Sequence, residues 1–388
     1  MHLVFSDQEI PNEITKSVFL AGPSPRDKSV NDWRFEALEF LAQKDFDGTV
    51  FIPVPQLRFF GGEDGKRWTY DNQVEWECKA RQVSDCIMFW VPRDIEGGMP
   101  AFTTNIEFGE DLSTGKILYG RPDNAEKCRY LDKRMEKVGQ VFNDLEKLVE
   151  QVIKVLGDGA KRYGGEVYVP LFIWNTDQFQ SWYKQLQENG NRLDEARVEH
   201  FLRFPNGYLF SFVLWVKVWI ASEVRHKSNE FIFSRKDIST IVPIFKDKDE
   251  TYIVLIKEFR SPVRNKAGLV YELPGGSALT PGEDPKENAA HELCEETGIN
   301  VEDINRFEFL SQKQICATLS SHHAFTYKVE LTKQEFEQVK SDIEKAKVFG
   351  VVEDTERTYL EIMPLSKMME YPLDYSMLGM IFAAIQKS

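Results

Sequence analysis

The first third of the chain alternates short apolar segments with segments of helical pattern, and this order limits the folds that it can adopt. The apolar segments cover residues 18–21, 50–54, 86–91 and 117–119, and the helical ones cover 31–43, 72–84 and 104–112. Strands and helices in this order predict a parallel sheet with helices on both faces. Because ligands of such sheets bind outside the carboxyl ends of the strands, we expect functional residues there.

Three marked segments fall at those ends. Gly22-Pro23 follows the first predicted strand, Asp94 follows the third, and Glu107 lies at the start of the next helix. A glutamate there can trap an oxocarbenium-like sugar and divide one displacement into two easier steps. The alternative is a capping box, in which Thr104 and Glu107 satisfy free backbone N–H groups at a helix start. Asp85 is expected to begin a strand rather than to catalyse.

Three sequence segments suggest a family for this part of the chain. Phe19 to Pro23 (FLAGP), Asn31 to Arg34 (NDWR) and Glu107 to Gly109 with Gly115-Lys116 resemble the nucleoside 2-deoxyribosyltransferase family, over about residues 16–135. The resemblance implies a Rossmann-like, flavodoxin-like parallel-sheet domain in which Glu107 is the catalytic nucleophile. The substrate-binding residues that it implies are Gly22, Pro23, Asp32, Trp33, Glu77 and Gly109. Glu77 stands where the family usually has an aspartate that contacts the leaving base.

A second segment, residues 276–299, places a cluster of carboxylates after a glycine-rich loop. On a helix, Glu292, Glu295 and Glu296 project from one face, while Ala289 and Leu293 can be buried on the other. Oxygen ligands of this kind suit Mg²⁺ or Mn²⁺, which bridge to substrate phosphates. The segment therefore predicts a divalent-metal site for phosphate chemistry on the first turns of a helix. The alternative is a solvated acidic helix that follows a glycine turn.

The same spacing resembles the Nudix hydrolase box. The positions in register are Glu283, Glu292, Leu293, Glu295, Glu296, Gly298 and Ile299. The resemblance implies a Nudix α/β/α sandwich in which Glu292, Glu295 and Glu296 hold Mg²⁺ and in which Glu292 and Glu296 are catalytic. Two features depart from the family: His291 replaces an arginine, and six residues rather than five separate Gly276 from Glu283. In the family that arginine orients the catalytic glutamate, so a histidine would weaken catalysis or make it pH-dependent.

The flanks of the box are similar to the ADP-ribose pyrophosphatase branch of the family. Residues 251–259 predict a strand, and Arg260 to Val263 (RSPV) and Tyr271 to Gly276 (YELPGG) follow it. The resemblance implies substrate-binding roles for Arg260, Gly275 and Gly276, and a further acidic residue within 353–356, for which Glu356 is the candidate. The general base is either Glu292 or a residue of that loop. Arg260 could instead cap a strand end, and the loop could be an ordinary polar turn.

The length of 388 residues has room for two or three domains. We expect a nucleoside 2-deoxyribosyltransferase-like domain over residues 1–135, a helical connecting region over 136–205 and a Nudix domain over 206–388. Amphipathic helices are predicted at 137–156 and 177–188. The apolar stretch 208–221 contains Lys217 and is shorter than the roughly 20 residues of a membrane-spanning helix, so we expect buried strands there.

Charge and cysteine usage limit the partners. The formal net charge of −14 opposes binding to nucleic acid or an anionic membrane, which requires basic patches. The five cysteines show neither paired nor metal-type spacing, and the N-terminus lacks the pattern of a signal peptide, so we expect a cytoplasmic protein with reduced thiols. Trp174, Trp182, Trp215 and Trp219 are expected to be core residues, or else to line a base-binding surface.

These observations predict a bifunctional, Mg²⁺-dependent enzyme of nucleotide metabolism. Its C-terminal domain would hydrolyse ADP-ribose or a similar nucleoside diphosphate derivative, and its N-terminal domain would cleave or transfer an N-glycosidic bond of a nucleoside or nucleotide. The expected partners are small-molecule nucleotides and further copies of the chain, in a dimer or higher homo-oligomer. Two alternatives remain open: an inactive Nudix domain that senses ADP-ribose and regulates the N-terminal domain, and an N-terminal domain that only dimerises or binds nucleotide.

Overall fold

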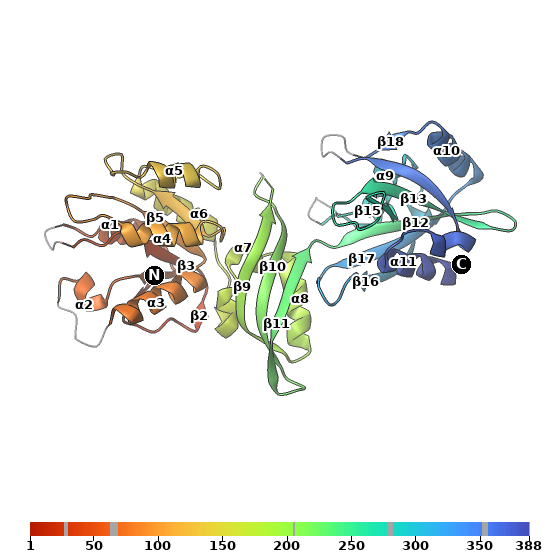
Figure 1. Ribbon diagram of the computed structural model, residues 1–388. Coiled ribbons are helices and arrows are strands. Elements are labelled where there is room, and N and C mark those ends of the chain that lie inside the picture. The colour runs from red at the N-terminus through yellow and green to blue at the C-terminus, as the bar shows by residue number, and fades with distance from the viewer. Residues whose placement is uncertain (27–29, 63–68, 205, 278–281, 351–355, 388) are drawn as a thin grey trace. The chain divides into compact units, whose positions relative to one another are not determined.

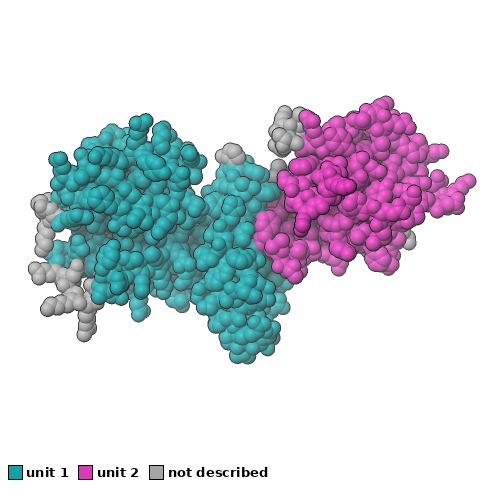
Figure 2. Space-filling view, viewed as in Figure 1, with its two compact units in different colours: residues 1–232 teal, residues 233–388 magenta. Residues whose placement is uncertain are grey.

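The computed structural model describes residues 1–26, 30–62, 69–204, 206–277, 282–350 and 356–387. The chain forms two compact units, residues 1–232 and residues 233–388 (Figure 2). Each unit has its own sheets and its own hydrophobic core. None of the helices in the described ranges has the length and apolar character needed to cross a bilayer.

Unit 1 is built on a six-stranded parallel sheet in the order β1-β4-β3-β5-β6-β7 (Figure 1). The strands are β1 (His2–Phe5), β3 (Ser17–Ala21), β4 (Thr49–Ile52), β5 (Cys86–Trp90), β6 (Ile117–Gly120) and β7 (Val141–Phe142). Without the edge strand β1, this is the 2-1-3-4-5 order of flavodoxin-like folds. The predicted class of the N-terminal domain is therefore confirmed.

Helices cover both faces of this sheet. The helices α1 (Trp33–Gln43) and α6 (Leu145–Leu156) pack on one face, and α3 (Tyr70–Val83), α4 (Phe102–Asp111) and α5 (Arg129–Met135) pack on the other; the short α2 (Gln56–Phe59) follows β4. In β3, Phe19 and Ala21 enter one core while Val18 and Leu20 enter the other, since successive side chains of a strand point to opposite faces. The strands and helices expected for the first third are confirmed to within a few residues.

The remainder of unit 1 contains a two-stranded pair and a three-stranded antiparallel sheet. The pair is β2 (Glu13–Ile14) with β8 (Arg162–Tyr163), and η1 (Gly164–Tyr168), α7 (Leu171–Trp174) and α8 (Asp177–Glu188) follow it. The sheet has the order β11-β10-β9, from β9 (Arg192–Arg203), β10 (Leu209–Ile220) and β11 (Arg225–Arg235). The expected domain boundary at 205/206 falls inside this sheet, between β9 and β10.

Two helix predictions for this region had different outcomes. The helix expected at 177–188 is α8 with the same bounds. The helix expected from residue 137 is wrong in its first part, because α6 begins at Leu145, where the Asp144 side chain caps it by accepting from Lys147 N at 2.9 Å. Residues 141–142 before that cap form β7 at the edge of the sheet. Trp174 and Trp182 pack at the margin of the α8 core.

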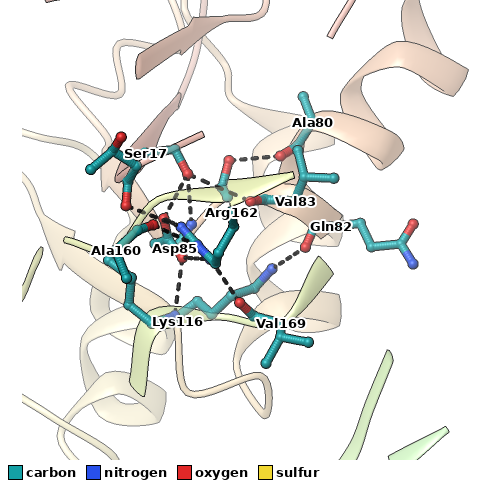
Figure 3. A network of polar contacts seen from close by, with 12 residues as sticks. Ser17, Ala80, Gln82, Val83, Asp85, Lys116, Ala160, Arg162 and Val169 are labelled. Atoms are coloured by element: carbon teal, nitrogen blue, oxygen red, sulfur yellow. Dashed lines mark hydrogen bonds and ion pairs between the residues drawn. The ribbon is translucent and has the colours of Figure 1, made fainter. Parts of the chain in front are cut away.

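A fully buried ion pair between Asp85 and Arg162 joins the parallel sheet to the segment after α6 (Figure 3). Arg162 Nη1 and Nη2 donate to Asp85 Oδ1 and Oδ2 at 2.7 and 2.6 Å. Ser17 Oγ and Leu171 N also donate to this carboxylate, each at 3.0 Å. Asp85 directly precedes β5, as expected of a strand-start residue, and its contacts are structural.

Unit 2 is built on a mixed sheet with the main order β16-β17-β12-β13-β19-β18, to which β14 and β15 are added (Figure 1). Its strands are β12 (Ile238–Lys246), β13 (Thr251–Phe259), β14 (Leu269–Glu272), β15 (Gly275–Gly276), β16 (Glu308–Gln314), β17 (His323–Glu330), β18 (Val348–Phe349) and β19 (Thr358–Pro364). The pair β12–β17 is parallel and the pairs on either side of it are antiparallel. The strand predicted at 251–259 is β13.

Helices again cover both faces of the sheet in unit 2. The helices α9 (Pro285–Thr297) and α10 (Lys333–Glu344) pack on one face, and α11 (Tyr375–Gln386) packs on the other. Short 3₁₀ turns, η2 (Ile304–Arg306) and η4 (Leu365–Glu370), complete the described elements. The expected α/β/α sandwich is confirmed.

Arg162→Met should destabilise the protein by about 3 to 5 kcal/mol, because it leaves Asp85 as a buried carboxylate without its cation. Equilibrium urea unfolding, followed by far-UV circular dichroism, measures the change. The double variant Asp85→Leu with Arg162→Met is the matched control, and it should recover much of the loss. A single variant within about 1 kcal/mol of wild type would contradict the structural role of the pair.

Candidate active sites

The turn after β3 is held by the start of α1. Arg34, a fully buried residue, donates from Nε to Leu20 O at 3.0 Å and from Nη2 to Gly22 O at 2.7 Å, and Trp33 Nε1 donates to Pro23 O at 3.1 Å. Gly22 has a φ of +147°, and a Cβ there would come within 2.1 Å of Trp90 O. The sequence therefore needs glycine at the carboxyl end of β3, where the parallel-sheet rule places a ligand.

Two predicted substrate-binding residues have contacts within this turn. Asp32 caps α1 by accepting from Arg34 N at 3.0 Å, and its carboxylate also lies 3.2 Å from Arg34 Nη1. Trp33 is buried. In the structure both side chains support the loop that Gly22 and Pro23 form.

The structure brings Glu77 of α3 and Glu107 of α4 together as a hydrogen-bonded carboxyl pair. Both are half-buried. Burial, and then the neighbouring charge of Glu77, raises the pKa of Glu107 to about 7. Burial also raises the pKa of Glu77, whose Oε1 accepts from Gln73 Nε2 at 2.6 Å. One carboxyl of the pair can thus be ionised while the other keeps its proton, an arrangement suited to nucleophilic or acid–base chemistry near neutral pH.

Two arginines limit the rise in these pKa values, since the positive charges of Arg34 and Arg81 favour ionised Glu107. Arg81 is buried and makes ion pairs with Asp111 at 2.6 Å and with Glu110 at 3.0 Å. The sequence analysis missed Gln73 and Arg81 as members of this site. Their spacing was a usable signal, because Gln73, Glu77 and Arg81 repeat every four residues and share one face of α3.

The capping-box interpretation of Glu107 is wrong. The helix α4 begins at Phe102 after Ala101, which has a φ of +55° and makes no side-chain cap. Thr104 and Glu107 are therefore the third and sixth residues of the helix rather than its cap and third residue, so they do not form a capping box. Thr104 is buried. The Glu107 carboxyl is consequently available for its contact with Glu77.

Gly109 was grouped with Glu107 by the family resemblance, yet the two residues lie on different faces of α4. At 100° per residue, Gly109 is about 160° from Glu107 around the helix axis. Gly109 lines a separate cavity with Phe108 and Leu112.

The predicted metal-binding carboxylates lie in the second half of α9 rather than in its first turns. The helix starts earlier than expected because Asp284 caps it, accepting from Lys286 N at 2.7 Å, and Pro285 occupies its first position. Ala289 and Leu293 are fully buried, as predicted. The helix ends at Gly298, whose φ of +70° is the left-handed conformation that glycine allows.

Glu292 and Glu296 are held against the glycine turn of β15. Glu296, only 3% exposed, accepts from Gly275 N at 2.8 Å. A Cβ on Gly276 would come within 2.4 Å of Glu292 Oε1, so a side chain there would displace this carboxylate. Burial, followed by the charges of Glu295 and Glu356, raises the pKa of Glu292 to about 7. Burial also raises the pKa of Glu296 well above its ordinary value.

The other acidic residues differ in how they join this cluster. Glu356 is half-buried, and its charge raises the pKa values of Glu292 and Glu296. Glu353 and Asp354 lie outside the described residues. Within the described ranges, no three His, Cys, Asp or Glu side chains form a group ready to hold a metal ion.

His291 and Arg260 have specific partners. His291 is exposed, and its Nδ1 lies 3.9 Å from Glu295 Oε2, so its ion-pair partner is the glutamate four residues further along the helix. Arg260 Nη2 lies 2.7 Å from Glu258 and 3.0 Å from Glu272. Glu272 also lines a cavity of about 300 Å³ together with Arg264, Tyr271 and Asp374.

Glu107→Gln should stabilise the protein at about pH 8 by about 1 to 3 kcal/mol and have little effect at about pH 5. Because its pKa is raised in the folded state, Glu107 keeps a proton that the unfolded chain releases, and stability falls as the pH rises from about 4.5 to about 7. Glutamine removes this loss. Thermal unfolding at both pH values measures the change in stability. The control is Glu75→Gln, which changes an exposed residue on α3. Equal effects of Glu107→Gln at the two pH values would contradict the shift.

Comparisons with known proteins match the two regions to two families. The NUDIX domain model matches residues 235–360, and the model described as "Nucleoside 2-deoxyribosyltransferase like" matches residues 15–124. No match was found among curated proteins.

Two solved structures illustrate what the chain is similar to. One, a crystal structure of an ADP compounds hydrolase, is 15% identical, covers 50% of this chain and 95% of its own, and has a TM-score of 0.33. The other, the NUDIX domain of Shewanella oneidensis NrtR complexed with ADP ribose, is 17% identical, covers 39% of this chain and 86% of its own, and has a TM-score of 0.29. From the two family matches, the chain combines a nucleoside 2-deoxyribosyltransferase-like domain in its N-terminal part with a NUDIX domain in its C-terminal part.

Proposed function

We propose that the C-terminal domain hydrolyses a nucleoside diphosphate linked to a second group, such as ADP-ribose, and that the N-terminal domain cleaves or exchanges an N-glycosidic bond. The observation that carries the first activity is the pair of buried carboxylates, Glu292 and Glu296, held against Gly275 and Gly276. The match to the NUDIX domain supports hydrolysis of the nucleoside diphosphate class.

The carboxylates of α9 fit a divalent cation. Glu292 and Glu296 are acidic side chains whose ionised forms are disfavoured by burial and by the charges of neighbouring carboxylates, and a dication would offset both costs. Glu292, Glu295 and Glu296 would hold Mg²⁺ or Mn²⁺. When bound, such a cation offsets charge on phosphate oxygens and makes water a stronger nucleophile.

The chain's own groups orient the carboxylates and the substrate. The Gly275 N–H fixes the Glu296 carboxylate, and the glycines of β15 leave room beside it. Arg260, positioned by Glu258 and Glu272, would bind a substrate phosphate, and the cavity at Tyr271 and Glu272 would accept the nucleoside. The general base would be either Glu292 or Glu356, two carboxylates whose charges interact in this cluster.

The second activity rests on the contact between Glu77 and Glu107. Ionised Glu107 would attack the anomeric carbon while the C–N bond breaks and its electron pair leaves with the base. The leaving nitrogen would take its proton from water, because the charge of Glu77 raises the pKa of Glu107 and Glu77 is therefore already ionised when Glu107 ionises. Water or an acceptor nucleoside would then attack the same carbon and release Glu107. Gly22 and Pro23 would line the substrate site at the carboxyl end of β3, and Asp32 and Trp33 keep the substrate-binding roles implied by the resemblance. Gly109 does not fit that role, because it lines the separate cavity on the other side of α4.

A nucleotide-sensing Nudix domain is the second candidate. It is favoured by the position of His291, which lies beside Glu295 and stands where the Nudix box has an arginine. Under this proposal the wild-type protein binds ADP-ribose without turning it over, and His291→Arg creates or sharply raises hydrolysis. Hydrolysis by wild type that His291→Arg leaves unchanged would exclude the sensor.

We also propose that the protein acts in the cytoplasm on small-molecule nucleotides, as a homodimer or a larger homo-oligomer. All five cysteines are free thiols in the structure, which supports a reducing compartment. The net charge of −14 supports small-molecule partners rather than nucleic acid.

Glu296→Gln should lower Mg²⁺-dependent hydrolysis of ADP-ribose by on the order of 100-fold or more, because it removes a ligand charge from the cation site. Mass spectrometry of the products from ADP-ribose, NAD and nucleotide sugars measures the rate. Glu287→Gln, an exposed change on the same helix, is the control and should keep wild-type turnover. Unchanged phosphate-bond products from Glu296→Gln would contradict the proposal.

Glu107→Gln should lower release of free base by on the order of 1,000-fold or more, because an amide cannot replace the carboxylate nucleophile. The same mass spectrometry with nucleoside and nucleotide substrates detects the base, and Glu75→Gln again serves as the control. Wild-type activity should rise as the pH passes through about 7, where Glu107 ionises. If base release survives in Glu107→Gln, the N-terminal domain uses another nucleophile.

A further inference from the structure

A cavity of about 340 Å³ lies between α4 and α5, away from the Glu77–Glu107 pair. It is lined from α4 by Asn105, Phe108, Gly109 and Leu112, from α5 by Tyr130, Leu131 and Arg134, and from the loops by Arg93 and Lys127. Because these α4 residues occupy the side of the helix opposite Glu107, the cavity is separate from the proposed glycosidic site. Its volume falls within the range of small-molecule sites.

Three cations line this cavity, and none has a carboxylate partner among the residues that the structure describes. Arg93, Lys127 and Arg134 make no described ion pair, whereas Arg81 and Arg121 of the same domain pair with Asp111 and Asp132. The acidic neighbour of Lys127, Glu126, accepts from Ile95 N at 2.8 Å. In a chain with a net charge of −14, three uncompensated cations around one cavity are unusual, and an anion would remove their mutual repulsion.

Arg93 is held rigidly and retains an unused donor. The residue is only 7% exposed; its Nη1 donates to Lys127 O at 3.0 Å and its Nη2 donates to Asn105 Oδ1. Its Nε is buried and has no hydrogen-bond partner within the described part of the chain. The two bonds from Nη1 and Nη2 fix the guanidinium in the cavity wall, so its positive charge is held beside the cavity without a carboxylate partner among the described residues.

The rest of the cavity suits an organic group. Phe108, Leu112 and Leu131 are buried apolar residues in its wall, and the Tyr130 ring is 75% exposed. A Cβ on Gly109 would meet no atom within 4 Å, so space remains next to the helix. A site that combines cations with apolar and aromatic surface fits a phosphate ester better than a bare anion.

We propose that the α4–α5 cavity is a binding site for a small organic phosphate of nucleotide size. Arg93, Lys127 and Arg134 would hold the phosphate, and the organic part would lie against Tyr130 and the apolar wall. The proposal does not depend on either activity proposed above, because no residue of the two carboxylate sites lines the cavity.

Hydrogen exchange of the full chain, measured by mass spectrometry, tests this site. The exchange buffer contains EDTA, and the two probes are AMP and inorganic phosphate. AMP should slow exchange in α5, which carries no residue of the Glu77–Glu107 pair, and inorganic phosphate should do so only at much higher concentration. The double variant Lys127→Gln with Arg134→Gln changes two exposed positions. It should raise, by about tenfold or more, the AMP concentration that gives half of the maximal slowing of exchange in α5, because charged hydrogen bonds to the phosphate are lost.

Arg129→Gln is the matched control, since it removes an exposed charge from α5 without touching the cavity, and it should change that concentration by less than about twofold. Three outcomes would overturn the proposal. The first is that neither probe slows exchange in α5, and the second is that Arg129→Gln has an effect as large as that of the double variant. The third is that AMP and inorganic phosphate protect α5 equally, which would show that the organic group is not recognised.

Discussion

The buried ion pair of Asp85 and Arg162 is the interaction on which the arrangement of unit 1 depends (Figure 3). Asp85 precedes the central strand β5, and Arg162 lies in β8, far along the chain, so their contact fixes where the chain goes after the parallel sheet. Ser17, beside the neighbouring strand β3, donates to the same carboxylate. Two charges can be buried here because nearly every donor and acceptor around them is paired, which offsets the high cost of removing ions from water. The amino ends of β3 and β5 are thereby held in place, at the edge of the sheet opposite the one where Gly22 lies.

Both candidate active sites use the same physical device, the crowding of partly or fully buried carboxylates on neighbouring elements. In unit 1, Glu77 and Glu107 share a hydrogen bond, and the arginines nearby favour their ionised forms. In unit 2, Glu292 and Glu296 have a backbone N–H and two glycines beside them. Protein cations therefore limit the electrostatic cost in the first site, whereas a bound metal ion would limit it in the second. The two sites suit different reactions, glycosidic substitution and phosphate-ester hydrolysis, because the charge that complements the carboxylates differs.

Local patterns in the sequence predicted elements well where burial and capping agree. The strand β13 is apolar along most of its length, and α8 has a capping threonine and a clear break after it, so both were predicted with their observed bounds. Prediction failed where a single capping residue decided the start of a helix. Asp144 begins α6 eight residues after the amphipathic pattern starts at Lys137, and Asp284 begins α9 before the carboxylates, which places them late in the helix. At Glu107, a motif that matched a cap lay inside α4, because the preceding chain was already helical.

The sequence by itself determined the fold class of both domains and the positions of the strands β3, β4, β5, β6 and β13, and it indicated the acidic residues proposed for both sites. It could do so because periodicity, glycine positions and carboxylate spacing are local properties. Only the tertiary structure showed that Glu77 of α3 contacts Glu107 of α4, that Asp85 forms an ion pair with Arg162, and that three cations line one cavity. These facts depend on contacts between residues far apart in the chain. Burial and charge at such contacts set the pKa values and the free donors, and no short segment of sequence contains that information.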